Sequence, residues 1–246
     1  MEKNYKLTLC YDGTRYRGWQ RQGNTSDTVQ AKLETLLSRL LEQTVEVHGS
    51  GRTDAGVHAA AQVASFRADT DKSCPELLGE IRQYLPEDIG ALSLEEVPRD
   101  FHARLSAREK TYTYRVWNSD APCVFERKYV YVFPRPLDLE AMRAAGAALC
   151  GRHDFAAFST GKKKGKAAVR TVYSVEIRRV GEEVRLTYTA DGFLYNMVRI
   201  LTGTLLEIGA GDRSAGDVER IFVSQNRAEA GFTVPARGLC LTEVRY

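Results

Sequence analysis

Hydrophobic residues recur at two spacings in the first 105 residues. Between residues 27 and 43 they lie three or four positions apart, which predicts an amphipathic helix with an apolar stripe at Val29, Leu33, Leu36, Leu37, Leu40 and Leu41. Asp27 or Thr28 can cap this helix. A second helix is predicted at residues 75–85, where Pro86 ends it. Alternating or β-branched runs predict strands at residues 6–11, 45–48, 61–66 and 91–97.

Residues 106–246 show the same mixture of patterns. Strands are predicted at residues 111–117, 171–180, 183–190 and 239–246, and helices at residues 139–150, 194–208 and 215–223. In the first of these strands, Tyr112 and Tyr114 share one face while Thr113 and Arg115 share the other. Grouped strands with separate helices favour an α+β fold with antiparallel sheets over a doubly wound sheet. We therefore predict two α/β halves, residues 1–105 and 106–246.

Composition narrows the class of protein. The chain has 246 residues, of which 43% are hydrophobic and 27% charged, as in ordinary soluble globular proteins. Its first residues lack the apolar core of a signal peptide, and no stretch approaches the ~18–20 apolar residues that span a membrane. The five cysteines form no C-x-x-C pair, and the four histidines lack metal-ligand spacing. These features predict a cytoplasmic, reduced protein without a metal site or a membrane segment.

Basic residues are concentrated in three runs, although the net charge is only +3. Residues 15–21 interleave three arginines with Tyr16 and Trp19, and residues 99–115 carry five basic residues against two acidic ones. Residues 162–170 include Lys162, Lys163, Lys164, Lys166 and Arg170, with no acid among them. Basic groups that alternate with aromatic rings suit a surface that meets phosphates and bases together. The lysine-rich run is equally typical of a solvated loop.

The loop between the second and third predicted strands is the main candidate for chemistry. Residues 50–60 read Ser-Gly-Arg-Thr-Asp-Ala-Gly-Val-His-Ala-Ala and place the single carboxylate Asp54 between Gly51 and Gly56. Such a loop commonly displays reactive groups, and its glycines permit positive φ or close approach to a ligand. Arg52 can keep Asp54 ionised or contact a phosphate. The alternative is a structural turn in which Asp54 bonds its own backbone.

The run Arg-Thr-Asp-Ala-Gly-Val-His at residues 52–58 resembles the active-site signature of the TruA-type tRNA pseudouridine synthases. Four further segments resemble signatures of the same family in the same order, at residues 11–22, 101–114, 192–199 and 238–241. The resemblance therefore extends over nearly the whole chain. It implies the pseudouridine synthase fold, in which the sheets of the two halves form one continuous central sheet with the substrate cleft between the halves.

The resemblance also implies an activity. The family converts uridine to pseudouridine in tRNA, at positions 38 to 40 of the anticodon arm, without a cofactor. It further implies a homodimer in which one tRNA touches both subunits. The reaction breaks the C1′–N1 bond, turns the uracil and joins C5 to C1′. Such chemistry needs a carboxylate, a group that handles the C5 proton, and a closed pocket that retains the free base.

Individual roles follow from the same resemblance. Asp54 matches the family nucleophile, and Tyr112 matches the active-site tyrosine, which otherwise would be a packed strand residue. Arg199 matches the basic partner of the aspartate, and a charge between Val198 and Ile200 is independently costly unless it is paired. Arg52 matches an arginine associated with displacing the target base, with a simple phosphate or aspartate contact as the alternative. The expected substrate-binding residues are Tyr112, Arg52, His58, Arg104, Lys162, Lys163, Lys164 and Lys166.

Two other classes of protein compete with this interpretation. A non-catalytic RNA-binding or RNA-folding protein on the same sheet would keep the basic and aromatic surface but would not need Asp54 and Arg199. A glycosidase or hydrolase that depends on carboxylates usually needs two of them, and the loop offers one. Isomerisation exchanges the hydrogen at C5 of uridine, whereas binding alone does not.

Overall fold

The computed structural model describes residues 2–161 and 165–246, and it divides the chain into two compact units. The first unit comprises residues 1–108 and 241–246, and the second comprises residues 109–240. The units divide the chain three residues after the predicted boundary at 105/106, and residues 241–246 belong to the first unit rather than the second. In the described part of the chain, no helix is long and apolar enough to cross a membrane.

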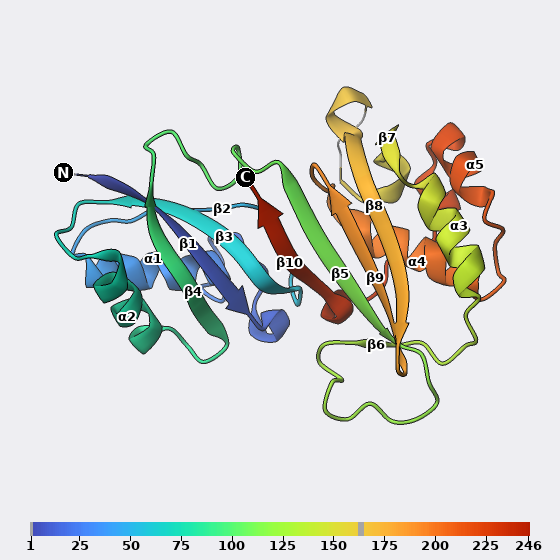
Figure 1. Ribbon diagram of the computed structural model, residues 1–246, viewed down its shortest axis with the longest axis horizontal. Coiled ribbons are helices and arrows are strands. Elements are labelled where there is room, and N and C mark those ends of the chain that lie inside the picture. The colour runs from blue at the N-terminus through green and yellow to red at the C-terminus, as the bar shows by residue number, and fades with distance from the viewer. Residues whose placement is uncertain (1, 162–164) are drawn as a thin grey trace. The chain divides into compact units, whose positions relative to one another are not determined.

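The first unit is built on an antiparallel sheet with the strand order β4-β1-β3, and β2 pairs with residues 64–66 along the other edge of β3 (Figure 1). The strands are β1 (Lys3–Tyr11), β2 (Val47–Gly49), β3 (His58–Ala68) and β4 (Ile89–Val97). Alternate residues of β1 point into the core, so Tyr5, Leu7 and Leu9 are buried. All four predicted strands of this half are confirmed, with longer bounds for β1, β3 and β4.

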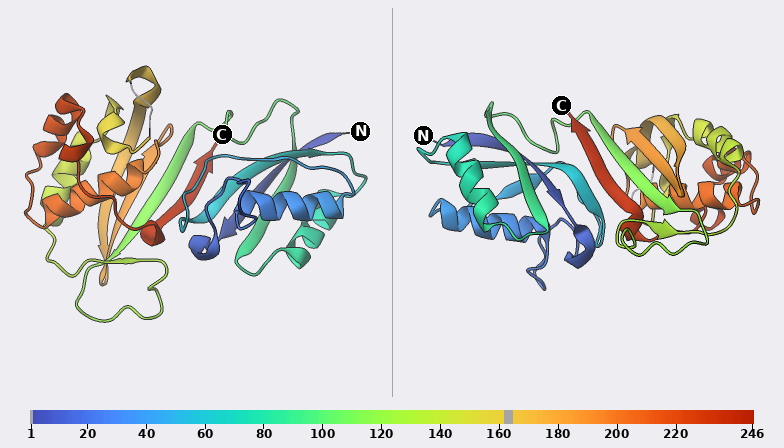
Figure 2. Two further views of the ribbon diagram at one scale, coloured as in Figure 1. Left: turned by 180° about the vertical axis from the view of Figure 1, so that it is seen from behind. Right: turned by 60° about the horizontal axis from the view of Figure 1, so that its bottom comes forward.

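Helices α1 (Val29–Leu40) and α2 (Cys74–Tyr84) pack against this sheet and against each other (Figure 2). The Thr28 hydroxyl accepts a hydrogen bond from the backbone N–H of Ala31, so Thr28 rather than Asp27 is the N-cap of α1. The predicted apolar stripe buries Val29, Leu33 and Leu37 completely. A capping box formed by Ser73 and Glu76 starts α2.

The second unit has a sheet in the order β5-β9-β8-β7, with antiparallel neighbours, and a short parallel strand β6 beside β5. Its strands are β5 (Glu109–Trp117), β6 (Tyr131–Val132), β7 (Gly151–Asp154), β8 (Val169–Val180) and β9 (Glu183–Ala190). Helices α3 (Leu139–Ala148), α4 (Met197–Gly209) and α5 (Asp217–Ser224) lie together on one face of this sheet (Figures 1 and 2). The last strand of the chain is β10 (Leu239–Arg245).

The predicted α+β class is confirmed, because both units combine helices with mostly antiparallel strands. The hairpin of β8 and β9 and the helices of the second half are also confirmed. Strands β6 and β7 were not predicted, and α4 begins three residues later than predicted. Asn196 has φ of +61°, a left-handed conformation that ends the preceding loop and delays the helix to Met197. Continuity of the sheet between the halves, and a cleft there, stay predictions.

Candidate active site

Asp54 lies on a tight turn between β2 and β3. The backbone N–H of Val57 donates to the carbonyl oxygen of Asp54 at 3.1 Å, which closes a four-residue turn. Gly56 is the third residue of this turn and has φ of +77°, the conformation that a type II turn reserves for glycine. The turn leaves the Asp54 side chain partly exposed and that of Arg52 exposed. The backbone conformation itself therefore explains the glycine at this position.

The segment at residues 11–19 holds this turn in place. The N–H of Trp19 donates to the carbonyl of Thr53 at 3.0 Å, and the N–H of Gly56 donates to the carbonyl of Tyr16 at 3.3 Å. The phenol of Tyr11 and the hydroxyl of Thr53 share a buried hydrogen bond of 2.8 Å. These bonds lie on both sides of Asp54. They restrict the backbone that carries the carboxylate, which is how a scaffold orients a reactive group before the substrate binds.

Two glycines of this segment permit the close contact. A Cβ atom at Gly13 would lie 2.0 Å from the carbonyl oxygen of Val57. Gly18 has φ of +97°, and a Cβ atom there would lie 2.7 Å from the carbonyl oxygen of Thr53. Trp19 is only 2% exposed, so it supports the loop from the core. The motif at residues 11–22 thus fits around the Asp54 turn.

We expect Gly18→Ala to lower the rate of the reaction more than it lowers stability. The new methyl group would push against Thr53 in a backbone conformation that costs about 1–3 kcal/mol for other residues. The displaced turn would carry Asp54 away from its position, so the single-turnover rate should fall at least about tenfold. Gly23→Ala is the matched control, because a methyl group there would meet no described heavy atom within 4 Å. Equal rates for the two variants would contradict this role of Gly18.

His58 follows the turn at the start of β3 and is 6% exposed. Its Nδ1 atom accepts a hydrogen bond of 3.0 Å from the backbone N–H of Gly13. This contact joins the end of the Asp54 loop to the segment that surrounds it. The burial and the partner of His58 favour a role in orienting the loop over direct contact with RNA.

Tyr112 lies in the middle of β5, opposite Tyr188 of β9. Its ring is 8% exposed and meets the ring of Phe193 edge-on, with centroids 5.2 Å apart. The predicted alternation is confirmed, because Tyr112 and Tyr114 are buried while Thr113 and Arg115 are only partly buried. Phe193 belongs to the late signature at residues 192–199, so that motif positions the ring of Tyr112.

Arg199 lies in the first turn of α4 and is partly exposed. Its Nε atom donates to the carbonyl oxygen of Val234 at 2.8 Å, and one terminal nitrogen donates to Oδ1 of Asn196 at 2.7 Å. The cost of an arginine among apolar neighbours is thus offset by fixed polar partners in the same unit.

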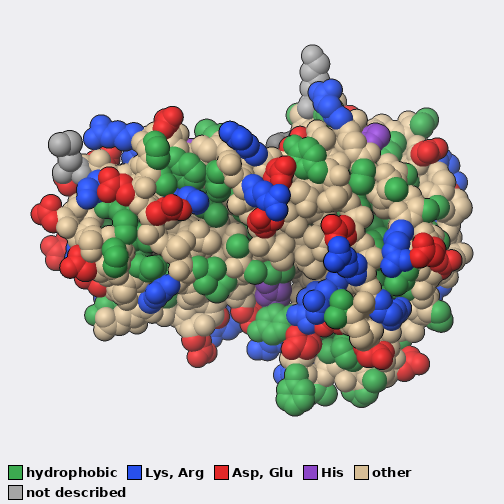
Figure 3. All heavy atoms as spheres, viewed as in Figure 1, with side chains coloured by type: hydrophobic (Ala, Val, Ile, Leu, Met, Phe, Trp, Pro, Cys, Tyr) green, Lys and Arg blue, Asp and Glu red, His purple; other side chains and the backbone are tan. Residues whose placement is uncertain are grey.

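The expected RNA-binding groups differ in how far the structure describes them. Arg52 and Arg104 are exposed on the first unit. Lys162, Lys163 and Lys164 lie outside the described residues, and Lys166 falls in the short helix of residues 165–168. On the face drawn in Figure 3, basic side chains lie among acidic ones and do not cover a continuous area.

Two arginines of the run at residues 15–21 are fixed by carboxylates. Arg15 is 69% exposed and its Nε atom lies 2.9 Å from a carboxylate oxygen of Asp88. Arg21 is 66% exposed and donates to Glu34 of α1 at 3.0 Å. Asp88 and Glu34 are themselves largely buried, with 13% and 8% of their side chains exposed. Each arginine is therefore held at one end and presents the rest of its guanidinium to solvent.

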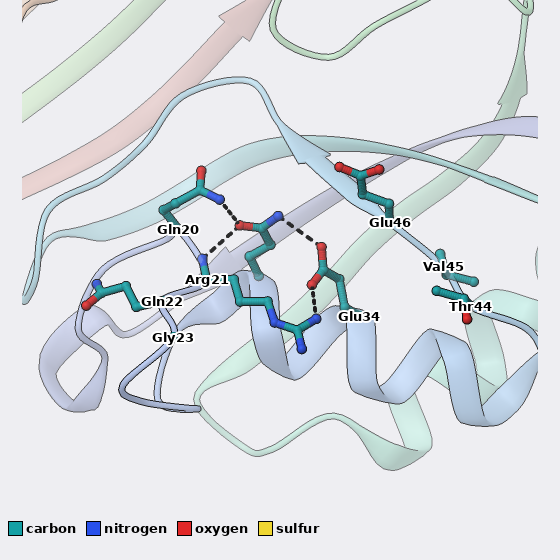
Figure 4. Close-up of a pocket in the computed structure, with 9 residues that line it drawn as sticks. Gln20, Arg21, Gln22, Gly23, Glu34, Thr44, Val45 and Glu46 are labelled. Carbon is teal, nitrogen blue, oxygen red and sulfur yellow. Dashed lines mark hydrogen bonds and ion pairs between the residues drawn. The ribbon is translucent and has the colours of Figure 1, made fainter.

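Glu34 is a buried carboxylate that sequence analysis missed. It accepts hydrogen bonds from Gln30 at 2.9 Å and from the backbone N–H of Val47 at 3.2 Å, besides that of Arg21. Gln30 in turn accepts from the side chain of Gln20 and from the backbone of Arg21. Figure 4 shows this network at the edge of a surface hollow, where it fastens the end of the arginine run to α1.

Comparison with known proteins identifies the family. A model of the family described as tRNA pseudouridine synthase matches residues 9–106 and 145–246. A protein of Bacillus sp. strain KSM-64 named tRNA pseudouridine synthase A is 42% identical over 243 residues, which cover 99% of each chain. A protein of the same name from Clostridium acetobutylicum is 42% identical over 244 residues, covering 99% of this chain and all of that one.

Among solved structures, the chain is similar to one from a Cbf5-Nop10-Gar1 complex, with a TM-score of 0.40 and 13% identity over 96% of this chain and 48% of that chain. The family assignment depends on the full-length relatives and on the matched family model. Asp54 lies in the first matched segment and Arg199 in the second. The chain belongs to the tRNA pseudouridine synthase family and is an isomerase that converts uridine in tRNA to pseudouridine.

Proposed function

We propose that this enzyme modifies uridines at positions 38 to 40 in the anticodon arm of tRNA, with Asp54 as the nucleophile. The observation that supports this role is the turn at residues 54–57, which displays one carboxylate on a backbone fixed by the segment at residues 11–19. A purely structural aspartate would not need this close support. A rigid turn keeps the carboxylate oriented and lowers the entropy lost when the substrate binds.

The reaction needs no cofactor, because uridine and pseudouridine are isomers. Asp54 can add to C1′ or to C6, or it can remove the 2′ proton to give a glycal. In each route the C1′–N1 bond breaks, the uracil turns, and C5 forms the new bond to C1′. The proton then leaves C5, and N1 of the product carries a proton. Tyr112 is proposed to stack on the uracil, and its hydroxyl to serve the proton transfer at C5.

The two arginines have different proposed roles. Arg199 is proposed, from the family resemblance, as the counter-charge of Asp54, and within its own unit its guanidinium is held by Val234 and Asn196. Arg52 takes the place of the target base in the stem, because a stacked uridine must leave the helix before any chemistry can occur. Arg104, His58 and the lysines Lys162, Lys163, Lys164 and Lys166 complete the proposed set that binds RNA or orients the site.

The deciding experiment measures tritium released from C5-tritiated uridine in a bulk tRNA transcript. Isomerisation should release the label at C5, and mapping of the product should place pseudouridine at positions 38 to 40. The non-catalytic alternative, an RNA-binding protein on this fold, predicts binding without release of tritium. If tritium is released but pseudouridine is found elsewhere in the tRNA, the proposed reaction stands and the proposed target positions are wrong.

The enzyme is further proposed to be a cytoplasmic homodimer in which one tRNA touches both subunits. The arm held at one active site leaves most of the tRNA beyond a chain of 246 residues with a net charge of +3. Basic runs from two chains would form a longer track along the phosphates. Light scattering should therefore report a dimer at working concentrations.

Mixing two inactive variants tests the shared track. One variant is Asp54→Asn, and the other lacks Lys162, Lys163, Lys164 and Lys166. Mixed dimers should recover activity, because the intact Asp54 of one chain is served by the intact lysines of the other. A monomer in light scattering, or verified mixed dimers without activity, would contradict the shared track.

A further inference from the structure

The turn at residues 102–106 in the first unit is held from inside by the imidazole of His102. Its Nδ1 atom accepts a hydrogen bond of 3.0 Å from the N–H of Arg104 and a longer one of 3.4 Å from the N–H of Leu105. Ser106 closes the turn, since its hydroxyl accepts from the N–H of His102 at 3.1 Å and its own N–H donates to the carbonyl of His102 at 2.9 Å. A ring nitrogen that accepts these bonds carries no proton, so the neutral imidazole is the form that holds the turn.

The same turn is fastened to the body of the unit through Ala103, which is completely buried. The N–H of Ala103 donates to the hydroxyl of Ser65 on β3 at 3.1 Å, and its carbonyl accepts from the phenol of Tyr246 at 2.8 Å. The next two side chains point outward, with Arg104 exposed and Leu105 79% exposed. The backbone of the turn is thus firmly anchored, while the cationic side chain of Arg104 is exposed to solvent.

The surroundings of His102 favour its neutral form. Its ring stacks on that of His48 on β2, with centroids 4.8 Å apart, and Arg104 lies in the same turn. Burial, followed by the neighbouring His48 and Arg104, lowers the pKa of His102 below its usual value of 6.5. The charged group beyond His48 is Glu46, whose carboxylate lies 3.9 Å from Nδ1 of His48. Glu46 is exposed and faces His48 rather than His102.

We propose that His102 is a positioning residue for substrate binding, and that its neutral imidazole fixes the turn that presents Arg104 to a phosphate of the RNA. The proposal depends on the proposed function, because it takes RNA as the substrate. A guanidinium can bind phosphate through two parallel hydrogen bonds, which requires a defined direction of approach. A turn that is already ordered reduces the entropy lost when that contact forms.

Two substitutions of His102 separate this role from general stability. His102→Ala removes the acceptor for both N–H groups, whereas His102→Asn retains one, because an Asn side chain bonds the backbone N–H two residues ahead. Affinity for a bulk tRNA transcript should fall about five- to tenfold for His102→Ala and stay near wild type for His102→Asn. If the turn forms without this acceptor, both variants should bind the transcript with equal affinity. That result would overturn the proposal.

Arg104→Ala shows whether His102 acts through Arg104. The variant should weaken binding and lower the slope of log affinity against log salt by roughly 0.7–0.9, the loss of one phosphate contact. In the Arg104→Ala background, His102→Ala should add little, because the residue that it positions is already absent. Full additivity of the two changes, or an unaltered salt slope in Arg104→Ala, would overturn the proposal.

The pH dependence gives an independent measurement. The lowered pKa keeps His102 neutral to lower pH than in an unfolded chain, so the bonds to Nδ1 are complete above about pH 6.5 and are lost as the pH falls through the lowered pKa. As the pH falls through this lowered pKa, the wild type should therefore lose affinity relative to His102→Asn, which has no proton to gain. Parallel curves would contradict the proposal. Tritium release by the wild type is measured separately. This measurement distinguishes a failure of the proposed function from a failure of the proposal for His102.

Discussion

Asp54→Asn is expected to reduce pseudouridine formation by roughly four orders of magnitude or more, the usual loss when a nucleophile is removed. The amide has nearly the shape of the carboxylate but cannot form the covalent bond or accept the proton that the three routes require. The turn should survive, because it is closed by the backbone carbonyl of residue 54 and by Gly56, neither of which the substitution changes. Affinity for tRNA and the melting temperature should therefore stay close to those of the wild type.

The measurement is a single-turnover tritium-release assay with enzyme in excess over tRNA. Asp71→Asn is a matched control, because it makes the same chemical change at an exposed position of the same unit. The control should react at the wild-type rate. Appreciable turnover by a well-folded Asp54→Asn protein would show that Asp54 is not the nucleophile. The role of Asp54 would then be that of a structural turn residue.

Regular elements were predictable wherever the local pattern agreed with the final packing. The stripe that predicted α1 contains the three leucine and valine positions that are fully buried, Val29, Leu33 and Leu37. Alternation likewise placed Tyr112 and Tyr114 on the buried face of β5. In these segments the residues that make contacts across the core also carry the periodic signal, so one sequence is sufficient.

Elements that depend on partners elsewhere in the chain were not predictable in this way. The strand β7, Gly-Arg-His-Asp, has no alternation of apolar residues and is formed by its pairing with β8. The buried carboxylate of Glu34 stands where a helix pattern predicts a polar, solvated residue. Its burial becomes favourable only because Arg21, Gln30 and Val47 supply hydrogen bonds from three segments.

The candidate site likewise combines residues that the sequence could predict with contacts that it could not. The family resemblance pointed to Asp54, Tyr112 and Arg199 as candidate residues, and the structure adds the close approach of Gly13 and Gly18 to the Asp54 turn. The residue type of His102 gave no indication of its contacts, because a histidine that accepts backbone hydrogen bonds looks like any other histidine in the sequence. A signal was present only in the spacing, since the ring of residue 102 can reach the N–H groups two and three positions ahead, as Asn and Asp side chains do in turns.

Arg199→Ala is the second large effect that we expect, and it should affect both stability and rate. The substitution removes two hydrogen bonds from a charged donor, to the carbonyl of Val234 and to Oδ1 of Asn196. Hydrogen bonds of charged groups contribute about 1.5–3 kcal/mol each, and Arg199 is only partly buried, so a loss of about 2–4 kcal/mol in the free energy of unfolding is expected. Chemical denaturation with urea measures this loss.

The rate should fall further than the stability alone explains, because Asp54 would lose its proposed counter-charge. Arg199→Lys distinguishes the two contributions, since it keeps the positive charge but cannot reproduce a planar group that donates in two directions. It should recover part of the rate and little of the stability. Arg178→Ala is the control, because that side chain is 75% exposed and its loss should change neither quantity. Normal melting and normal activity of Arg199→Ala would show that the arginine neither stabilises the start of α4 nor pairs with Asp54. A loss of stability with an unchanged rate would limit the role of Arg199 to stabilising the helix.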